Sequence, residues 1–192
     1  MSMDLDSVFK KVDRGLFLPD GYEKQKDVDL PIPIGRGQTT SAPSVIRHML
    51  ELLQLRKGDK VLEIGTGFGY QTALLCELVG DENVVSVERY YELYERARFN
   101  LERAGYHPIL RVGDGSCGWD EFAPYDRIIA SASYPEFPEQ LKGQLTEEGI
   151  AVLPVGRLVQ RLVVYEKEYD RITYDIPVIF VPMIGRCGYK DG

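Results

Sequence analysis

The chain has 192 residues, of which 44% are hydrophobic, so it is long enough to bury one sizeable core, and its length favours a single domain. The formal net charge is -7, from 23 basic and 30 acidic residues, and no block of Lys and Arg is long enough to hold a phosphate backbone. This charge argues against a general nucleic-acid-binding protein. No apolar run reaches the roughly 18 residues that span a bilayer, so we expect a soluble, cytoplasmic protein without a membrane partner.

The cysteines are odd in number and far apart in the sequence, at Cys76, Cys117 and Cys187. They show neither CxxC spacing nor the Cys/His spacing of a zinc site. We therefore predict reduced thiols, with no disulfide framework and no metal. Cys76 lies inside an apolar helical pattern and is expected to be part of the core.

The first part of the chain predicts little regular structure. Residues before Gln38 are rich in Pro and Gly and predict a folded-over loop. A helix is predicted over residues 42–53, with Ser41 near its N-cap and Pro43 in its first turn.

From residue 61 onward, predicted strands alternate with predicted helices. The strands are expected at residues 61–65, 83–88, 108–113, 125–132 and 149–156, and the helices at 70–78, 91–104 and 138–145. Such alternation predicts an α/β fold with a mostly parallel, doubly wound sheet. The last third has two β-rich segments, at residues 161–167 and 178–181, with no helix between them, which predicts an antiparallel extension of the sheet. No internal repeat is present.

The stretch VLEIGTGFGY places glycines at alternate positions after a predicted strand. Gly65, Gly67 and Gly69 give G-x-G-x-G, whereas a dinucleotide fingerprint needs G-x-G-x-x-G. The spacing therefore weakens the prediction of a bound pyrophosphate. Glycines here still let the backbone approach a flat ligand, and the start of the following helix favours a carboxylate such as that of S-adenosylmethionine.

Three acidic residues lie near this loop. Glu88 ends the second strand, where a carboxylate can accept both hydroxyls of a ribose, in NAD and S-adenosylmethionine alike. Glu63 would repel a pyrophosphate but suits an ammonium or sulfonium group. Asp114 follows the third strand and is placed to receive an adenine amino group. Simpler interpretations exist, because a glycine turn can be a tight connection, Glu88 a helix cap and Asp114 a turn residue. Their common place at strand ends on one sheet edge favours a ligand site.

Several segments together resemble the protein-L-isoaspartate O-methyltransferases, which use S-adenosylmethionine. They run from about Gly15 to the end and read DRGLFLPD, PIPIGRGQTTSAP, VLEIGTGFGYQTALL, VVSVER, VGDGSCGW, APYDRIIASA, LPVG and VIFVPMIG. The glycine loop and the acidic strand end are general to class I methyltransferases, whereas GQTTSAP, APYD and the FVP tail are more specific. The sequence departs from the family in having Thr40 where Ile is usual and in its short N-terminus.

The resemblance implies a Rossmann-like fold, the cofactor S-adenosylmethionine with the product S-adenosylhomocysteine, and damaged proteins with isoaspartyl residues as substrates. It implies one domain made of a substrate-side segment (1–60), a cofactor-binding core (61–156) and a C-terminal β extension (157–192). Ser41 is the expected catalytic residue, touching the isoaspartyl carboxylate. The other expected substrate contacts are Gln38, Thr39, Thr40, Pro43, Phe180, Val181 and Pro182. The expected cofactor contacts are Glu63, Gly65, Thr66, Gly67, Gly69, Glu88, Arg89, Asp114 and Gly115.

The chemistry of this reaction fits the residues. A carboxyl group with a pKa of about 4 is already ionised at neutral pH, so neither His48 nor His107 is needed as a base. Ser41 is therefore expected to position the carboxylate rather than to act as a nucleophile. Three alternatives remain: a class I methyltransferase for RNA or a small molecule, a non-catalytic S-adenosylmethionine-binding protein and an NAD oxidoreductase. A monomer is favoured.

Overall fold

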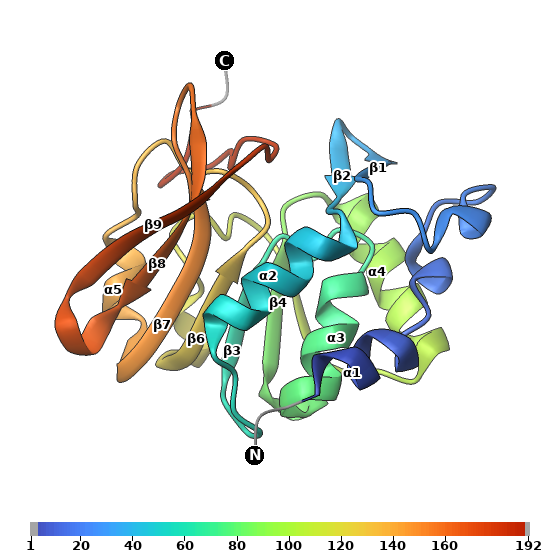
Figure 1. Cartoon of the computed structure of the whole chain (residues 1–192), viewed down its shortest axis with the longest axis horizontal. Coiled ribbons are helices and arrows are strands. Elements are labelled where there is room, and N and C mark those ends of the chain that lie inside the picture. The colour runs from blue at the N-terminus through green and yellow to red at the C-terminus, as the bar shows by residue number, and fades with distance from the viewer. Residues whose placement is uncertain (1–3, 191–192) are drawn as a thin grey trace.

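One seven-stranded sheet forms the centre of the protein, whose residues 4–190 are described by a computed structural model (Figure 1). Its strands are β3 (Val61–Ile64), β4 (Val84–Glu88), β5 (Ile109–Val112), β6 (Tyr125–Ala130), β7 (Leu145–Val155), β8 (Gln160–Glu166) and β9 (Arg171–Val178). Their spatial order is β5-β4-β3-β6-β7-β8-β9. The pairs from β5 to β7 are parallel, and β8 and β9 continue the sheet antiparallel. The predicted mostly parallel sheet with an antiparallel extension is confirmed.

Helices cover both faces of this sheet. They are α1 (Leu5–Lys11), α2 (Pro43–Leu53), α3 (Tyr70–Val79), α4 (Tyr91–Ala104) and α5 (Gln140–Gly143). Each face of the sheet packs against its own buried cluster. One cluster contains residues of α2, α3 and α4, and the other contains Leu141 of α5. Successive strand residues alternate between them, so Val61 joins the first cluster and Leu62 the second. Within residues 4–190, no helix is long and apolar enough to cross a membrane.

Most predicted boundaries in the parallel half match the structure. Gly105 ends α4 in the left-handed conformation, with φ of 87°, as its sequence position predicts. In α2 the N-cap is Ala42, without a side-chain hydrogen bond, and Pro43 is the first helical residue. Ser41 therefore lies outside the cap, so its hydroxyl is not committed to the start of the helix.

The helix predicted over residues 138–145 is wrong in length, because α5 has only four residues. The chain returns to the sheet at Leu145, which pairs with Tyr125 of β6. The register then shifts, so that Ile150 pairs with Arg127, two residues further along β6. The TEEG stretch forms this irregularity, and the strand therefore begins earlier than its apolar run indicates.

The second C-terminal strand is also displaced from its prediction. It is β9, whereas residues 179–181 are not in a strand. Because β9 is the edge of the sheet, most of its residues are exposed or half-buried. Its sequence, RITYDIPV, contains no apolar run, so a search for apolar runs does not predict this strand.

The segment before Gln38 is more ordered than the predicted loop. It contains α1 and the first strand of an antiparallel hairpin, β1 (Ile32–Gly35) and β2 (Gln38–Thr40). Arg36 and Gly37 form the tight turn with φ of 54° and 70°. Figure 1 shows this hairpin at the same end of the molecule as the C-terminal segment, defined here as residues 182–190.

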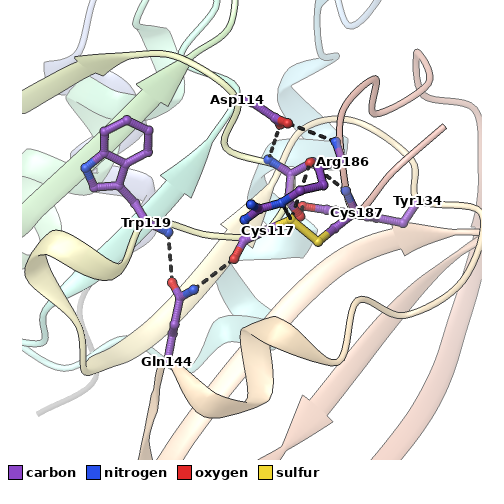
Figure 2. The surroundings of a disulfide bond; sticks show 8 residues. Asp114, Cys117, Trp119, Tyr134, Gln144, Arg186 and Cys187 are labelled. Atoms are coloured by element: carbon purple, nitrogen blue, oxygen red, sulfur yellow. Dashed lines mark hydrogen bonds between the residues drawn. A yellow bond between two sulfur atoms is a disulfide. The ribbon is translucent and has the colours of Figure 1, made fainter. Parts of the chain in front are cut away.

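The prediction of reduced thiols is wrong for two cysteines, because Cys117 and Cys187 form a disulfide (Figure 2). Their Cα atoms are 5.1 Å apart although 70 residues separate them in the sequence. The fold brings them together, since the Arg186 amide donates to Asp114 and the Cys187 amide donates to Ser116. Spacing in the sequence gives no sign of this contact. Cys76 is a free, buried thiol in the core, as predicted.

Candidate active site

A pocket lies at the carboxyl ends of β3, β4 and β6, and we call it the glycine-loop pocket. It is lined by Ile34, Gln38, Thr39, Ile64, Gly65, Gly67, Val87, Glu88, Arg89, Tyr90, Leu93, Gly115, Ser131, Ala132, Val181, Pro182, Met183 and Ile184. The strand β4, which follows β3 in the sequence, pairs with one side of β3, and β6 pairs with the other side. This reversal of strand order is where open α/β sheets bind ligands.

The three glycines of the loop have different roles. Gly65 and Gly67 line the pocket, with φ of 98° and 57°. Gly69 lies outside it, although it was predicted to contact the cofactor. A Cβ atom on Gly69 would lie 3.0 Å from the Leu101 side chain, and its φ is 95°. The third glycine therefore lets α3 begin close to α4, while the first two leave open backbone beside the pocket.

Glu88 lies at the pocket wall at the end of β4. Its side chain is buried and accepts hydrogen bonds from the Gly67 amide at 2.9 Å and the Tyr90 amide at 3.0 Å. Burial raises the pKa of Glu88, and the two amides oppose that shift. A carboxylate can accept about four hydrogen bonds, so oxygen lone pairs remain for hydroxyls of a ligand. This arrangement fits the predicted ribose contact.

Glu63 lies beneath the loop, outside the pocket, although a direct contact with the cofactor was predicted. It is fully buried and accepts from Gln71 at 3.0 Å, from Thr72 at 2.5 Å and from Ser86 at 2.6 Å. The Thr66 hydroxyl lies 2.6 Å from that of Ser86. Burial raises the pKa of Glu63 to about 7, against these hydrogen bonds. The carboxyl group thus joins β3, β4 and α3 below the glycines.

Asp114 also points away from the glycine-loop pocket. It accepts from the Ser116 amide at 2.9 Å and from the Arg186 amide at 2.8 Å (Figure 2). Burial opposes its charge, but these hydrogen bonds leave the pKa of Asp114 below its ordinary value. The neighbouring Gly115 does line the pocket, and a Cβ there would lie 3.1 Å from Ile64 and Val87. Asp114 therefore holds the C-terminal segment against this wall.

The remaining predicted cofactor residues are Arg89 and Thr66. Arg89 lines the glycine-loop pocket and donates to the Ile184 carbonyl at 2.8 Å, so it also holds the C-terminal segment. Thr66 is buried and borders a second cavity, described next.

Two cavities adjoin the glycine-loop pocket on the hairpin side. The Ser41 cavity is lined by Thr39, Thr40, Ser41, Ile46, Gly65, Thr66, Gly67, Phe68, Tyr70, Gln71 and Ser131. The Phe180 cavity is lined by Pro31, Thr39, Ser41, Ala42, Val45, Ser131, Ile176, Pro177, Val178, Ile179, Phe180 and Val181. The predicted substrate residues border these three spaces, except Pro43, which borders a separate surface pocket with Arg14 and Tyr70.

Arg14 is a residue near the site that the sequence analysis did not single out. It is buried, and it donates to the carbonyls of Val28 at 2.7 Å, Leu30 at 3.0 Å and Ser41 at 3.5 Å. It therefore gathers the chain on both sides of the hairpin around one guanidinium. Its signal in the sequence is its place in DRGLFLPD, one of the segments that carry the family resemblance.

Ser131 was missed as well, although it borders all three cavities. It directly follows β6, and its amide donates to the Ile64 carbonyl at 2.9 Å. The strand-end rule that selected Glu88 and Asp114 applies equally to this position. A serine at a strand end, as in ASAS, indicates a ligand site less strongly than a carboxylate does.

The two histidines and the aromatic residues that follow Asp114 line none of the three cavities, and their contacts are with the rest of the fold. His48 Nε2 lies 2.6 Å from Asp175 Oδ2, and the His107 amide donates to Asp81. Trp119 and Phe122 pack against the second buried cluster rather than in the glycine-loop pocket. Among residues 4–190, no group of three or more His, Cys, Asp or Glu side chains is placed to hold a metal ion.

Known proteins are similar to this chain in sequence over almost its whole length. The family model described as protein-L-isoaspartate(D-aspartate) O-methyltransferase matches residues 2–188. Protein-L-isoaspartate O-methyltransferase of Methanothrix thermoacetophila is 50% identical over 184 residues, which cover 94% of this chain and 88% of that protein.

Solved structures agree with the sequence match. One named protein-L-isoaspartate O-methyltransferase has a TM-score of 0.87 at 32% identity and covers 97% of this chain, which spans 63% of that one. A Plasmodium falciparum structure in complex with S-adenosyl-L-homocysteine has a TM-score of 0.81 and covers 96% of this chain and 92% of its own. At 23% identity, this second likeness concerns the fold alone.

Proposed function

Because the chain belongs to the protein-L-isoaspartate(D-aspartate) O-methyltransferase family, we propose how its own residues divide the work of that reaction. The protein is an S-adenosylmethionine-dependent carboxyl methyltransferase that acts on L-isoaspartyl residues of damaged proteins. The division of its site into a cofactor side and a peptide side is our proposal.

The glycine-loop pocket is the proposed cofactor side. Gly65, Gly67 and Gly115 offer backbone without a Cβ, and Glu88 offers acceptor capacity for the ribose hydroxyls. Arg89 is the remaining proposed contact. S-adenosylmethionine supplies an activated methyl group on a sulfonium. We assign Thr66, Glu63, Gly69 and Asp114 a supporting role, because they hold the walls of this pocket from outside it.

The Ser41 and Phe180 cavities are the proposed peptide side. The Ser41 hydroxyl donates to one oxygen of the isoaspartyl carboxylate and leaves the other oxygen free to attack. Gln38, Thr39 and Thr40 line the approach from β2, while Phe180, Val181 and Pro182 border it from the other wall. The proposed part of Pro43 is limited to starting α2 directly after the Ser41 segment.

The reaction needs no general base in this site. The carboxylate is ionised at neutral pH, so its oxygen attacks without losing a proton. The protein contributes by aligning the two reactants, which can account for about 7 to 11 kcal/mol of the barrier. The observation that carries the assignment is that Ser41 and the glycines Gly65 and Gly67 border one cavity.

The test is methyl transfer from labelled S-adenosylmethionine to an isoaspartyl peptide and to its normal aspartyl twin. We expect a base-labile methyl ester on the isoaspartyl peptide alone. In Ser41→Ala, kcat/KM should fall about 10- to 100-fold, the effect of one hydrogen bond to a charged group. Binding of S-adenosylhomocysteine, measured by calorimetry, should stay within about twofold.

Ser44→Ala is the matched control, because Ser44 is exposed and borders none of the three cavities. Equal labelling of both peptides would contradict the function. A base-stable product would instead indicate methylation at nitrogen, and labelling of RNA in a parallel assay would favour an RNA methyltransferase. Binding of the cofactor without any turnover would favour a non-catalytic protein.

Three further expectations belong to this proposal. The monomeric state is tested by light scattering, and the absence of nucleic-acid and membrane partners by binding assays. A cytoplasmic location remains a proposal, and the disulfide between Cys117 and Cys187 is unusual for that compartment. Fractionation of cells that produce the protein tests it.

A further inference from the structure

Ser131 occupies the junction between the proposed cofactor and peptide sides. Of the described residues, only Thr39 and Ser131 border the glycine-loop pocket, the Ser41 cavity and the Phe180 cavity together. Thr39 comes from the hairpin on the same wall as Ser41. Ser131 comes from the end of β6, beside the glycine loop. Ser41 and Ser131 line the Ser41 cavity and the Phe180 cavity together, and they come from different elements of the fold.

Among the described residues, the Ser131 hydroxyl accepts one hydrogen bond and donates none. Gln71 donates through Nε2 to the Ser131 hydroxyl oxygen at 3.1 Å, and through the same nitrogen to Glu63 at 3.0 Å. Gln71 is buried, and this one nitrogen contacts both oxygens. The hydroxyl of Ser131 therefore acts as an acceptor toward the protein. Among residues 4–190, no acceptor is within hydrogen-bond reach of its own proton.

From this geometry we propose that Ser131 is a second carboxylate-binding residue, which donates to the isoaspartyl carboxylate together with Ser41. One donor fixes a single carboxylate oxygen but leaves the group free to rotate about that contact. A second donor, from another element of the fold, fixes the plane of the carboxylate and with it the direction of the attacking lone pair. This inference rests on the proposed function.

The step balances without moving a proton through either serine. A lone pair of the carboxylate oxygen forms the new oxygen–carbon bond, and the pair of the broken carbon–sulfur bond stays on sulfur. Ser131 keeps its proton throughout. Ser131 therefore contributes only by binding and orienting the carboxylate. A peptide without a negative carboxylate gains less from this hydrogen bond.

The experiment measures how Ser131→Ala changes the preference for a carboxylate over a neutral amide. Two peptides are compared, one with the free isoaspartyl carboxylate and one in which an amide replaces it. Each is titrated into the protein saturated with S-adenosylhomocysteine, so binding is read without turnover. We expect wild type to prefer the carboxylate, and Ser131→Ala to reduce that preference about tenfold or more.

Two further variants keep the result independent of misfolding. Ser131→Thr retains the hydroxyl and should retain most of the preference, and Ser44→Ala should behave as wild type. A double-mutant cycle with Ser41→Ala should be non-additive, because both hydroxyls bind one group. Thermal unfolding of every variant shows that the fold is intact.

The outcomes separate this inference from the function on which it rests. If wild type fails to methylate the isoaspartyl peptide, the proposed function is overturned. If wild type is active but Ser131→Ala keeps the full preference, only the inference is overturned. A loss of S-adenosylhomocysteine affinity in Ser131→Ala would assign the hydroxyl to the cofactor instead. The inference is likewise wrong if Ser131→Thr behaves as the alanine variant.

Discussion

Glu63 shows how a buried carboxyl group makes the stability of this protein depend on pH. Burial raises its pKa to about 7 from an ordinary value of 4.5. Between these values the folded protein binds a proton that the unfolded chain has lost. The free energy of unfolding therefore falls as pH rises from about 4.5 to about 7 and then levels off, by on the order of 3 kcal/mol.

The matching prediction concerns Glu63→Gln, which cannot ionise. As pH rises from 5 to 8, the free energy of unfolding of wild type should fall relative to that of the variant. Only wild type has a buried carboxyl group at residue 63 that ionises over this range. Urea unfolding at several pH values measures the difference, and the exposed Glu82→Gln serves as the control. Parallel pH profiles for wild type and Glu63→Gln would refute the link.

Single residues also mark the limit of prediction from sequence. Glu88 and Gly65, predicted from an acidic strand end and a glycine loop, both line the glycine-loop pocket. Glu63 and Asp114 lie near the pocket as expected, but the structure directs their oxygens to protein donors. The pattern of residue types fixes which strand end a carboxylate occupies. The direction of the side chain depends on the neighbours that it meets after folding.

Among the elements, the C-terminal segment is held to the glycine-loop pocket by several independent contacts. Met183 and Ile184 line the pocket, Arg89 holds Ile184, and the disulfide fixes Cys187 to Cys117. The segment is thus part of the wall of the proposed cofactor side, although it is far from the glycine loop in sequence.

Reduction of the disulfide should therefore affect both stability and cofactor binding. For a closed loop of 70 residues, the chain-entropy estimate of the stabilisation is about 4 kcal/mol. Thermal unfolding with and without a phosphine reductant, and of Cys117→Ala/Cys187→Ala, measures the loss. Calorimetry with S-adenosylhomocysteine should show weaker binding in the same samples. The free Cys76 is common to all of them, and unchanged unfolding after complete reduction would contradict the prediction.

The elements that the sequence predicted well are those that are buried on both sides or ended by a strong signal. The helix α4 has a regular pattern and a terminal glycine, and β3 is a short apolar run. The predicted positions of the edge strand β9 and of the start of β7 were wrong. Pairing with a neighbouring strand sets the bounds of both, and their apolar content does not. The hairpin β1–β2 is too short for a periodic signal.

On the scale of the whole molecule, the proposed site needs three distant parts of the chain. The hairpin supplies Thr39, the glycine loop supplies Gly65, and the region after β9 supplies Val181. The mostly parallel sheet that carries the glycine loop was predicted from the alternation of strands and helices, whereas its strand order comes from the structure. The meeting of the hairpin and the C-terminal segment was not predicted, because long-range contacts leave no periodic trace in the sequence.

The disulfide also spans the exposed turn between β7 and β8, since Cys117 precedes that turn and Cys187 follows it. Arg157 and Leu158 in this turn are exposed, so limited trypsin treatment is expected to cut there. The two fragments should migrate as one species on a non-reducing gel and as two after reduction. A chain nicked at Arg157 would thus remain a single covalent molecule.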